Sequence, residues 1–253
     1  MSEKKRWVLV SLFGMAMAWL ESATVAYLRT FVDRIEPYQP NPLPMTPGLG
    51  EAELVREAAT LLMLFTVGWL AGKTWRARVG YFLIAFGVWD IFYYVFLKII
   101  TGWPHSMWDW DILFLIPLPW WGPVIAPVII AALMIFCGTL VTQFDYSAQT
   151  IWPQRWTWAL NLSGVALALF VFMVEAIRAL PDGTEAIRNT LPHRFNWLLF
   201  LLAVTLIAAP IGDAIIQIWR KRRQRMALPS GKVNFSVHSL FMILLYKIIS
   251  HDT

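Results

Sequence analysis

Six blocks of apolar residues follow one another along this chain of 253 residues, and most are close to the length that crosses a lipid bilayer. A helix needs about 20 residues to span a hydrocarbon core about 30 Å thick. Only 15% of the residues are Asp, Glu, Lys or Arg, against roughly 25% in soluble domains. The pattern therefore predicts a multi-pass membrane protein. It excludes a soluble globule, a disordered chain and a nucleic-acid-binding module, despite the net charge of +5.

The blocks predict an all-α fold, in which six transmembrane helices form one domain over residues 1–226. The first block follows a charged start and therefore resembles a signal peptide, but we expect it to be retained as the first helix. No internal repeat is visible. The expected spans are 7–28, 54–71, 79–100, 120–141, 156–177 and 195–219.

The fourth block, Asp111–Val141, is about ten residues longer than one crossing requires. Proline removes a backbone hydrogen bond from a helix, so the proline-rich start of the block is unsuited to a regular span. We expect a short interfacial or re-entrant piece at 107–118, on the external side, followed by a proline-broken fourth helix from Trp120. The prolines concerned are Pro117, Pro119, Pro123 and Pro127.

The distribution of positive charge predicts the orientation. With six spans, 14 of the Lys and Arg residues lie on the side of the termini and 7 on the other side. Cytoplasmic loops carry the excess of positive charge in membrane proteins. We therefore expect the protein to lie in the inner membrane of the cell, with both termini in the cytoplasm. Residues 227–253 then form a cytoplasmic tail. Its apolar or amphipathic stretch, 235–250, is expected to contact the membrane surface or a partner.

Ionisable groups inside a span cost free energy, so each is a candidate for function. Two carboxylates stand out, because Glu21 lies inside the first expected helix and Asp90 near the centre of the third. Aromatic side chains accompany both. An internal ion pair that holds the bundle together explains these carboxylates as well as a transport or catalytic site does. The candidate intramembrane site is Glu21, Asp90, Tyr93, Tyr94, Trp19 and Trp89.

Further charged residues lie near the external ends of the expected helices. Interfacial solvation, or pairing with a neighbouring charge, is the structural explanation for most of them. Glu175 and Arg178, for example, are three residues apart and can pair along one helix face. We also expect Glu21, Asp90, Arg29 and Tyr94 to meet in the outer half of the membrane. The candidate external rim is Arg29, Arg56, Glu57, Asp109, Asp111, Glu175 and Arg178.

Cysteine and histidine usage limits the possible chemistry. The single Cys137 excludes a disulfide within the chain. No histidine lies in the middle of an expected span, so ligands for a transmembrane haem, copper or zinc site are missing. We therefore predict no metal site and no cofactor, although carboxylates alone can bind hard cations. A bound lipid, quinone or carotenoid stays open, because Trp19 and Trp89 offer surfaces for stacking.

Three functions remain. The sequence favours an integral membrane subunit of a larger, energy-transducing complex, with a structural or docking role and with other membrane proteins and lipids as partners. A small proton- or ion-coupled transporter that uses Glu21 and Asp90 is the first alternative. A membrane enzyme that acts on a lipid or quinone in the outer leaflet is the second. A non-enzymatic role is preferred, because no nucleophile with its base and no nucleotide motif is present.

Overall fold

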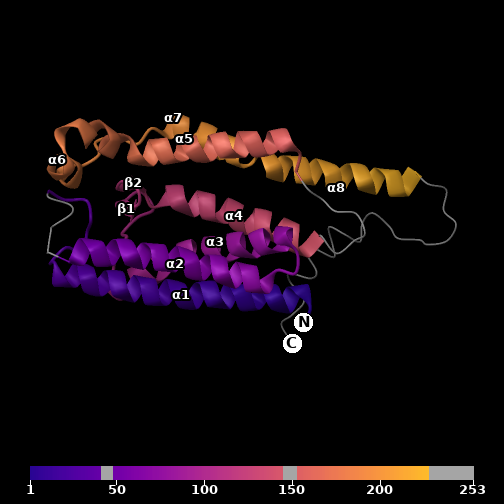
Figure 1. The fold of residues 1–253 in the computed structure, drawn as a ribbon, viewed down its shortest axis with the longest axis horizontal. Coiled ribbons are helices and arrows are strands. Elements are labelled where there is room, and N and C mark those ends of the chain that lie inside the picture. Colours follow the sequence, from indigo (N-terminus) through magenta and orange to yellow (C-terminus); the bar gives the residue numbers. More distant parts are fainter. Residues whose placement is uncertain (41–47, 145–152, 228–253) are drawn as a thin grey trace. The chain divides into compact units, whose positions relative to one another are not determined.

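A computed structural model describes residues 1–40, 48–144 and 153–227 of the chain (Figure 1). Contacts between residues divide the chain into two units, Met1–Ile215 and Ile216–Thr253. The cavity described below belongs to the first unit. The expected limit of the membrane domain at residue 226 stays a prediction. The apolar stretch 235–250 lies outside the described residues.

The described part of the chain is mostly helical and contains six helical segments that are long and apolar enough to cross a membrane. This confirms a multi-pass membrane protein. Each expected span overlaps one of these six segments, although the ends differ by a few residues. The helices are α1 Glu3–Phe31, α2 Leu49–Ala71, α3 Trp75–Thr101, α4 Ile125–Phe144, α5 Arg155–Ala179, α6 Thr184–Asn189, α7 Trp197–Ile207 and α8 Ala209–Ala227, with a 3₁₀ turn η1 at Leu180–Asp182.

Local chemistry sets several of these helix ends. The side chains of Ser2 and Thr74 cap α1 and α3 by accepting hydrogen bonds from backbone N–H groups in the first turn. Gly102 ends α3 in the left-handed conformation, with φ of 80°, which costs glycine little. Caps of this kind satisfy backbone groups that the helix leaves without partners.

A β-hairpin precedes the fourth helix, so the mostly helical fold also contains two short strands, and the residues from Trp120 that were expected to begin a helix form the second strand. Strands β1 Trp110–Phe114 and β2 Trp120–Pro123 pair antiparallel. Aromatic and branched residues favour strands, while the prolines of the connecting turn and at the end of β2 cannot continue a helix. Helix α4 therefore begins at Ile125. Pro127 is tolerated there, because backbone N–H groups in a first turn have no helical partner.

The last expected span is divided into two helices. Helix α7 ends at Ile207 and α8 begins at Ala209. Pro210 lacks an N–H group, so it interrupts the helical hydrogen-bond pattern at this point. Asn161 of α5 donates a side-chain hydrogen bond of 2.8 Å to the carbonyl of Ile207, one of the backbone groups at this break.

Helix α3 is packed against α1, α2 and α4, and these helices run side by side in Figure 1. Buried residues such as Met17, Leu64 and Ile84 form a core between α1, α2 and α3. Gly87 allows a close approach of α3 to α4, because a Cβ atom there would lie 2.5 Å from the carbonyl oxygen of Ala131. We call the end of this bundle where α1 and α3 finish and α2 begins the distal end.

Candidate binding site at the distal end of the bundle

A cavity of about 450 Å³ lies at the distal end of the bundle. Its walls come from α1, α2 and α3, from the hairpin and its turn, and from α6. Most of the lining is apolar, but charged side chains enter it from α1, α2, α3 and α6 and from the loop after α1. These charged residues are Glu21, Arg29, Arg34, Glu51, Glu53, Arg56, Glu57, Asp90 and Arg188.

Glu21 is held by an ion pair that joins α1 to α2. Its carboxylate pairs with the guanidinium of Arg56 and accepts a hydrogen bond of 3.1 Å from the hydroxyl of Thr60. Arg56 also pairs with Glu53, one turn earlier in α2, at 2.8 Å. Glu21 and Thr60 are both buried. Glu21 therefore has its charge balanced and its position fixed by α2.

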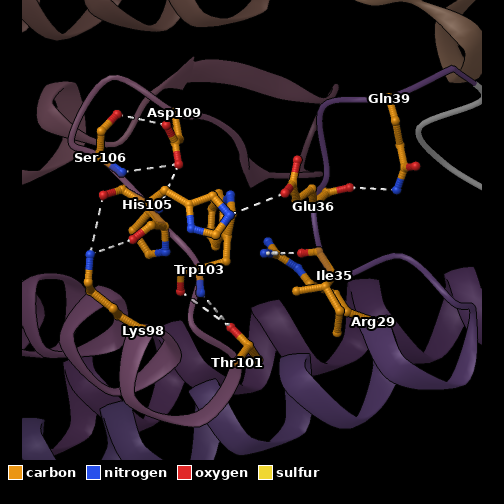
Figure 2. A network of polar contacts seen from close by, with 11 residues as sticks. Arg29, Ile35, Glu36, Gln39, Lys98, Thr101, Trp103, His105, Ser106 and Asp109 are labelled. Carbon is orange, nitrogen blue, oxygen red and sulfur yellow. Dashed lines mark hydrogen bonds and ion pairs between the residues drawn. The ribbon is translucent and has the colours of Figure 1, made fainter.

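A second ion pair fixes the hairpin to α1. Arg29 near the end of α1 donates to the carboxylate of Asp111 in β1 at 2.7 Å, and Asp111 is fully buried. The guanidinium also lies 4.5 Å from the centre of the Trp103 ring and donates to the carbonyl of Ile35 at 3.3 Å. Figure 2 shows Arg29 between Ile35 and Trp103. The three contacts bring α1, the loop after it, the loop after α3 and the hairpin together.

Glu57 provides the third connection, between α2 and the turn of the hairpin. Both of its carboxylate oxygens accept a hydrogen bond from the backbone N–H of Leu115, at 3.1 and 3.0 Å. The Glu57 side chain is buried. The turn that covers the cavity is therefore attached to a charged group of α2.

Asp90 differs from these carboxylates because it has no partner. It is 9% exposed and lines the cavity, yet within the described residues its carboxylate makes no hydrogen bond or ion pair, and Oδ2 is buried without a partner. Trp89, Tyr93 and Tyr94 beside it also line the cavity, and the ring of Trp89 lies 6.2 Å from that of Phe114 in the hairpin. The cavity therefore presents an unsatisfied carboxylate among aromatic rings.

The structure brings several of the predicted site residues together. Glu21, Asp90, Arg29 and Tyr94 all line the cavity, as the sequence led us to expect, with Trp89, Tyr93, Arg56 and Glu57. Trp19 is not among the lining residues. It is 47% exposed on α1, and its ring meets the edge of Phe96 at 5.2 Å. Whether the lining residues act in function stays a prediction.

The remaining rim residues lie elsewhere. Asp109 organises the loop after α3, where it accepts hydrogen bonds from the Ser106 hydroxyl and from the backbone of Ser106 and His105 (Figure 2). Partial burial raises the pKa of Asp109, but the hydrogen bonds together lower this pKa by more than burial raises it. The pKa of Asp109 therefore lies below its ordinary value. Glu175 and Arg178 pair at 2.8 Å along α5, as their spacing predicted.

Sequence reasoning missed two contributors to the site. Glu53 and Thr60 were not selected, although both contact the Glu21–Arg56 pair. The sequence contains a pattern that could have identified them, because residues 53, 56, 57 and 60 are three or four positions apart and therefore share one helix face. The role of the hairpin was also missed, since a continuous apolar run of this length does not distinguish a strand from a helix.

Within the ranges that the structure describes, no group of three or more His, Cys, Asp or Glu side chains has a metal-binding arrangement. The absence of a metal site, like that of a cofactor, stays a prediction. Comparison of the chain with protein-family models, with curated proteins and with solved structures gave no match. A function for this chain is therefore inferred from the residues of the cavity alone.

Proposed function

We propose that this chain is a small membrane transporter, with the distal cavity as its substrate site and Asp90 as the carboxylate that couples transport to a proton or cation. The observation that carries the proposal is the isolation of Asp90. Of the cavity's buried and half-buried carboxylates in the described structure, Glu21, Glu53 and Glu57 have partners, whereas Asp90 has none.

A buried carboxylate without a counter-charge is costly in a membrane, and it persists where function requires it. Such a group is neutralised by a proton or by a bound cation, so it can exchange one for the other. Asp90 is 11 residues before the end of α3, or about 16 Å along the helix at 1.5 Å per residue. This depth, near the middle of the span, is typical of coupling sites in transporters.

The proposal changes the relative weight of the three functions expected from the sequence. Glu21 is assigned a structural role, because its ion pair with Arg56 leaves it no free charge. For the subunit of a larger complex, the exposed apolar side chains of the helices give no specific support, since lipid covers such side chains equally well. An enzyme in the outer leaflet would use the same Asp90 as acid or base, so the experiment below is designed to detect it.

We place the protein in the inner membrane of the cell with both termini in the cytoplasm, on the distribution of Lys and Arg. The distal end then faces the outside, and the cavity receives its substrate from there. The buried core of α1, α2 and α3, which includes Val10, Met17 and Tyr81, lies between the cavity and the other side. The conformation is therefore assigned as outward-facing.

Transport by the purified protein in liposomes tests the proposal. Solid-supported-membrane currents would be recorded for a panel of amino acids, sugars, organic acids and organic amines. We expect a current for at least one class, and its loss in Asp90→Asn. Asp182→Asn, the same change at an exposed carboxylate outside the cavity, is the matched control and should behave as wild type.

Four outcomes would count against the proposal. Folded wild-type protein that gives no current with any solute, and takes up none of them in radiolabelled form, excludes transport. A full current in Asp90→Asn excludes the assigned role of Asp90. A solute that is recovered chemically changed, with no net movement across the membrane, indicates the enzyme instead. A stoichiometric partner that copurifies with a protein inactive by itself indicates the complex subunit.

A further inference from the structure

We infer that the cavity beside Asp90 binds an organic cation, such as a protonated primary amine or a quaternary ammonium. The inference rests on the proposed function, because it names the class of molecule that the proposed transporter carries. It also makes a claim about binding that can be tested without transport.

The charges around the cavity favour a positive ligand. Five carboxylates and four arginines line it. Of the two arginines in the bundle itself, Arg29 is paired with Asp111, and Arg56 with Glu21 and Glu53. A positive ligand would therefore meet a carboxylate that has no partner in the described residues, while the guanidinium groups of the bundle already have carboxylate partners.

Arg34 and Arg188 belong to a different part of the cavity's lining. Both line the cavity from outside the membrane-spanning helices, Arg34 from the loop after α1 and Arg188 from α6. Arg34 donates to the carbonyl of Pro40 at 2.7 Å. Glu51, an exposed residue in the first turn of α2, lines the same region and offsets positive charge there.

The aromatic residues around Asp90 match the same ligand. Trp89, Tyr93, Tyr94 and Phe114 line the cavity, and the rings of Tyr93 and Tyr94 are 5.0 Å apart. The face of an aromatic ring attracts a cation, most strongly for Trp and when the site is shielded from water. A carboxylate combined with several such rings is suited to an ammonium group that carries apolar substituents.

The dimensions of the cavity favour a small organic molecule over a bare metal ion as its occupant. A volume of about 450 Å³ is within the range of about 300 to 1,000 Å³ that small-molecule sites occupy. In the described residues, Asp90 is not part of any metal-binding group of side chains. An apolar lining of Val25, Ile112 and Leu113 supplies contacts for a hydrocarbon part that a metal ion lacks.

Binding of three probes of similar size to the full chain in lipid nanodiscs tests the inference. The probes are phenethylamine, which is cationic at pH 7, the neutral 2-phenylethanol and the anionic 3-phenylpropionate. Empty nanodiscs correct for partition into lipid. Isothermal titration should show saturable binding of phenethylamine alone. In Asp90→Asn its affinity should fall at least about tenfold, since a buried charge pair is lost; Asp182→Asn should bind as wild type does.

Equal or tighter binding of the neutral or the anionic probe would overturn the inference, as would undiminished binding of phenethylamine to folded Asp90→Asn. If that variant does not fold, the comparison of the three probes on wild-type protein decides alone. Failure of the inference is distinguishable from failure of the proposed function. Transport of uncharged solutes without amine binding contradicts only the ligand class, and amine binding without any transport contradicts only the transporter.

Discussion

Glu21 and Asp90 are both buried carboxylates within membrane-spanning helices, and their surroundings differ completely. Glu21 has Arg56 and Thr60 as partners, whereas Asp90 has no partner in the described structure. A paired charge stabilises the two helices that it joins. An unpaired one contributes nothing to the stability of the bundle and is therefore assigned to function.

Substitution separates these two roles at the residue scale. Glu21→Gln leaves the half-buried Arg56 with less charge compensation, so we expect the free energy of unfolding to fall by about 1 to 3 kcal/mol. Asp90→Asn removes a charge that has no partner, so stability should be unchanged or higher. Thermal unfolding of the two variants in detergent, beside wild type, measures this difference. An equal loss in both variants would contradict the assignment of Glu21 as structural and Asp90 as functional.

At the scale of elements, strand β1 and the turn of the hairpin form one wall of the cavity. The hairpin is attached to α1 through Arg29 and Asp111 and to α2 through Glu57 and Leu115. Helix α3 supplies Asp90 and is itself held against α4 by small residues. The position of Asp90 relative to the hairpin therefore depends on how closely α3 and α4 approach each other, because the hairpin continues directly into α4.

Gly87→Ala tests this close approach. A Cβ at residue 87 would lie 2.5 Å from the carbonyl oxygen of Ala131. This oxygen belongs to the backbone of α4, so it cannot move aside as the end of a side chain can. We expect a loss of about 1 to 3 kcal/mol in stability, together with weaker ligand binding. Gly212→Ala is the control, because no atom lies within 4 Å of its added Cβ. Thermal unfolding of both variants provides the measurement, and a stable Gly87→Ala protein would show that the two helices separate easily.

At the scale of the whole molecule, the six helical segments decide which connections share a side of the membrane. The turn between α2 and α3 contains Lys73, and the connection between α5 and α7 contains Asp182. Because three helical segments, α3, α4 and α5, separate them, these two connections face opposite sides of the membrane. The cavity opens on the side of Asp182, because that side is the distal end.

Cysteine labelling in intact cells tests the orientation. In a Cys137→Ser background, Lys73→Cys and Asp182→Cys each place one thiol at an exposed position. A membrane-impermeant maleimide should label Asp182→Cys and leave Lys73→Cys unlabelled until the cells are opened, because the excess of Lys and Arg keeps the side of Lys73 in the cytoplasm. The reverse pattern would place the cavity on the cytoplasmic side.

Most of the helices were predictable from the sequence, because a lipid bilayer requires about 20 apolar residues for each crossing whatever the helices pack against. The candidate residues were predictable for a related reason. An ionisable side chain is rare within a span, so Glu21 and Asp90 were visible at once. The hairpin was not, since its strands are as apolar as the helix that follows them.

By itself, the sequence determined that the chain crosses the membrane repeatedly and which buried carboxylates deserve testing. Only the tertiary structure decided that Glu21 is paired, that Asp90 has no partner in the described residues and that Trp19 is not part of the cavity lining. The physical reason is the solvent. A helix in lipid is apolar on all sides, so its sequence does not show which face meets a neighbour, and the partner of each charge is known only once the helices have packed.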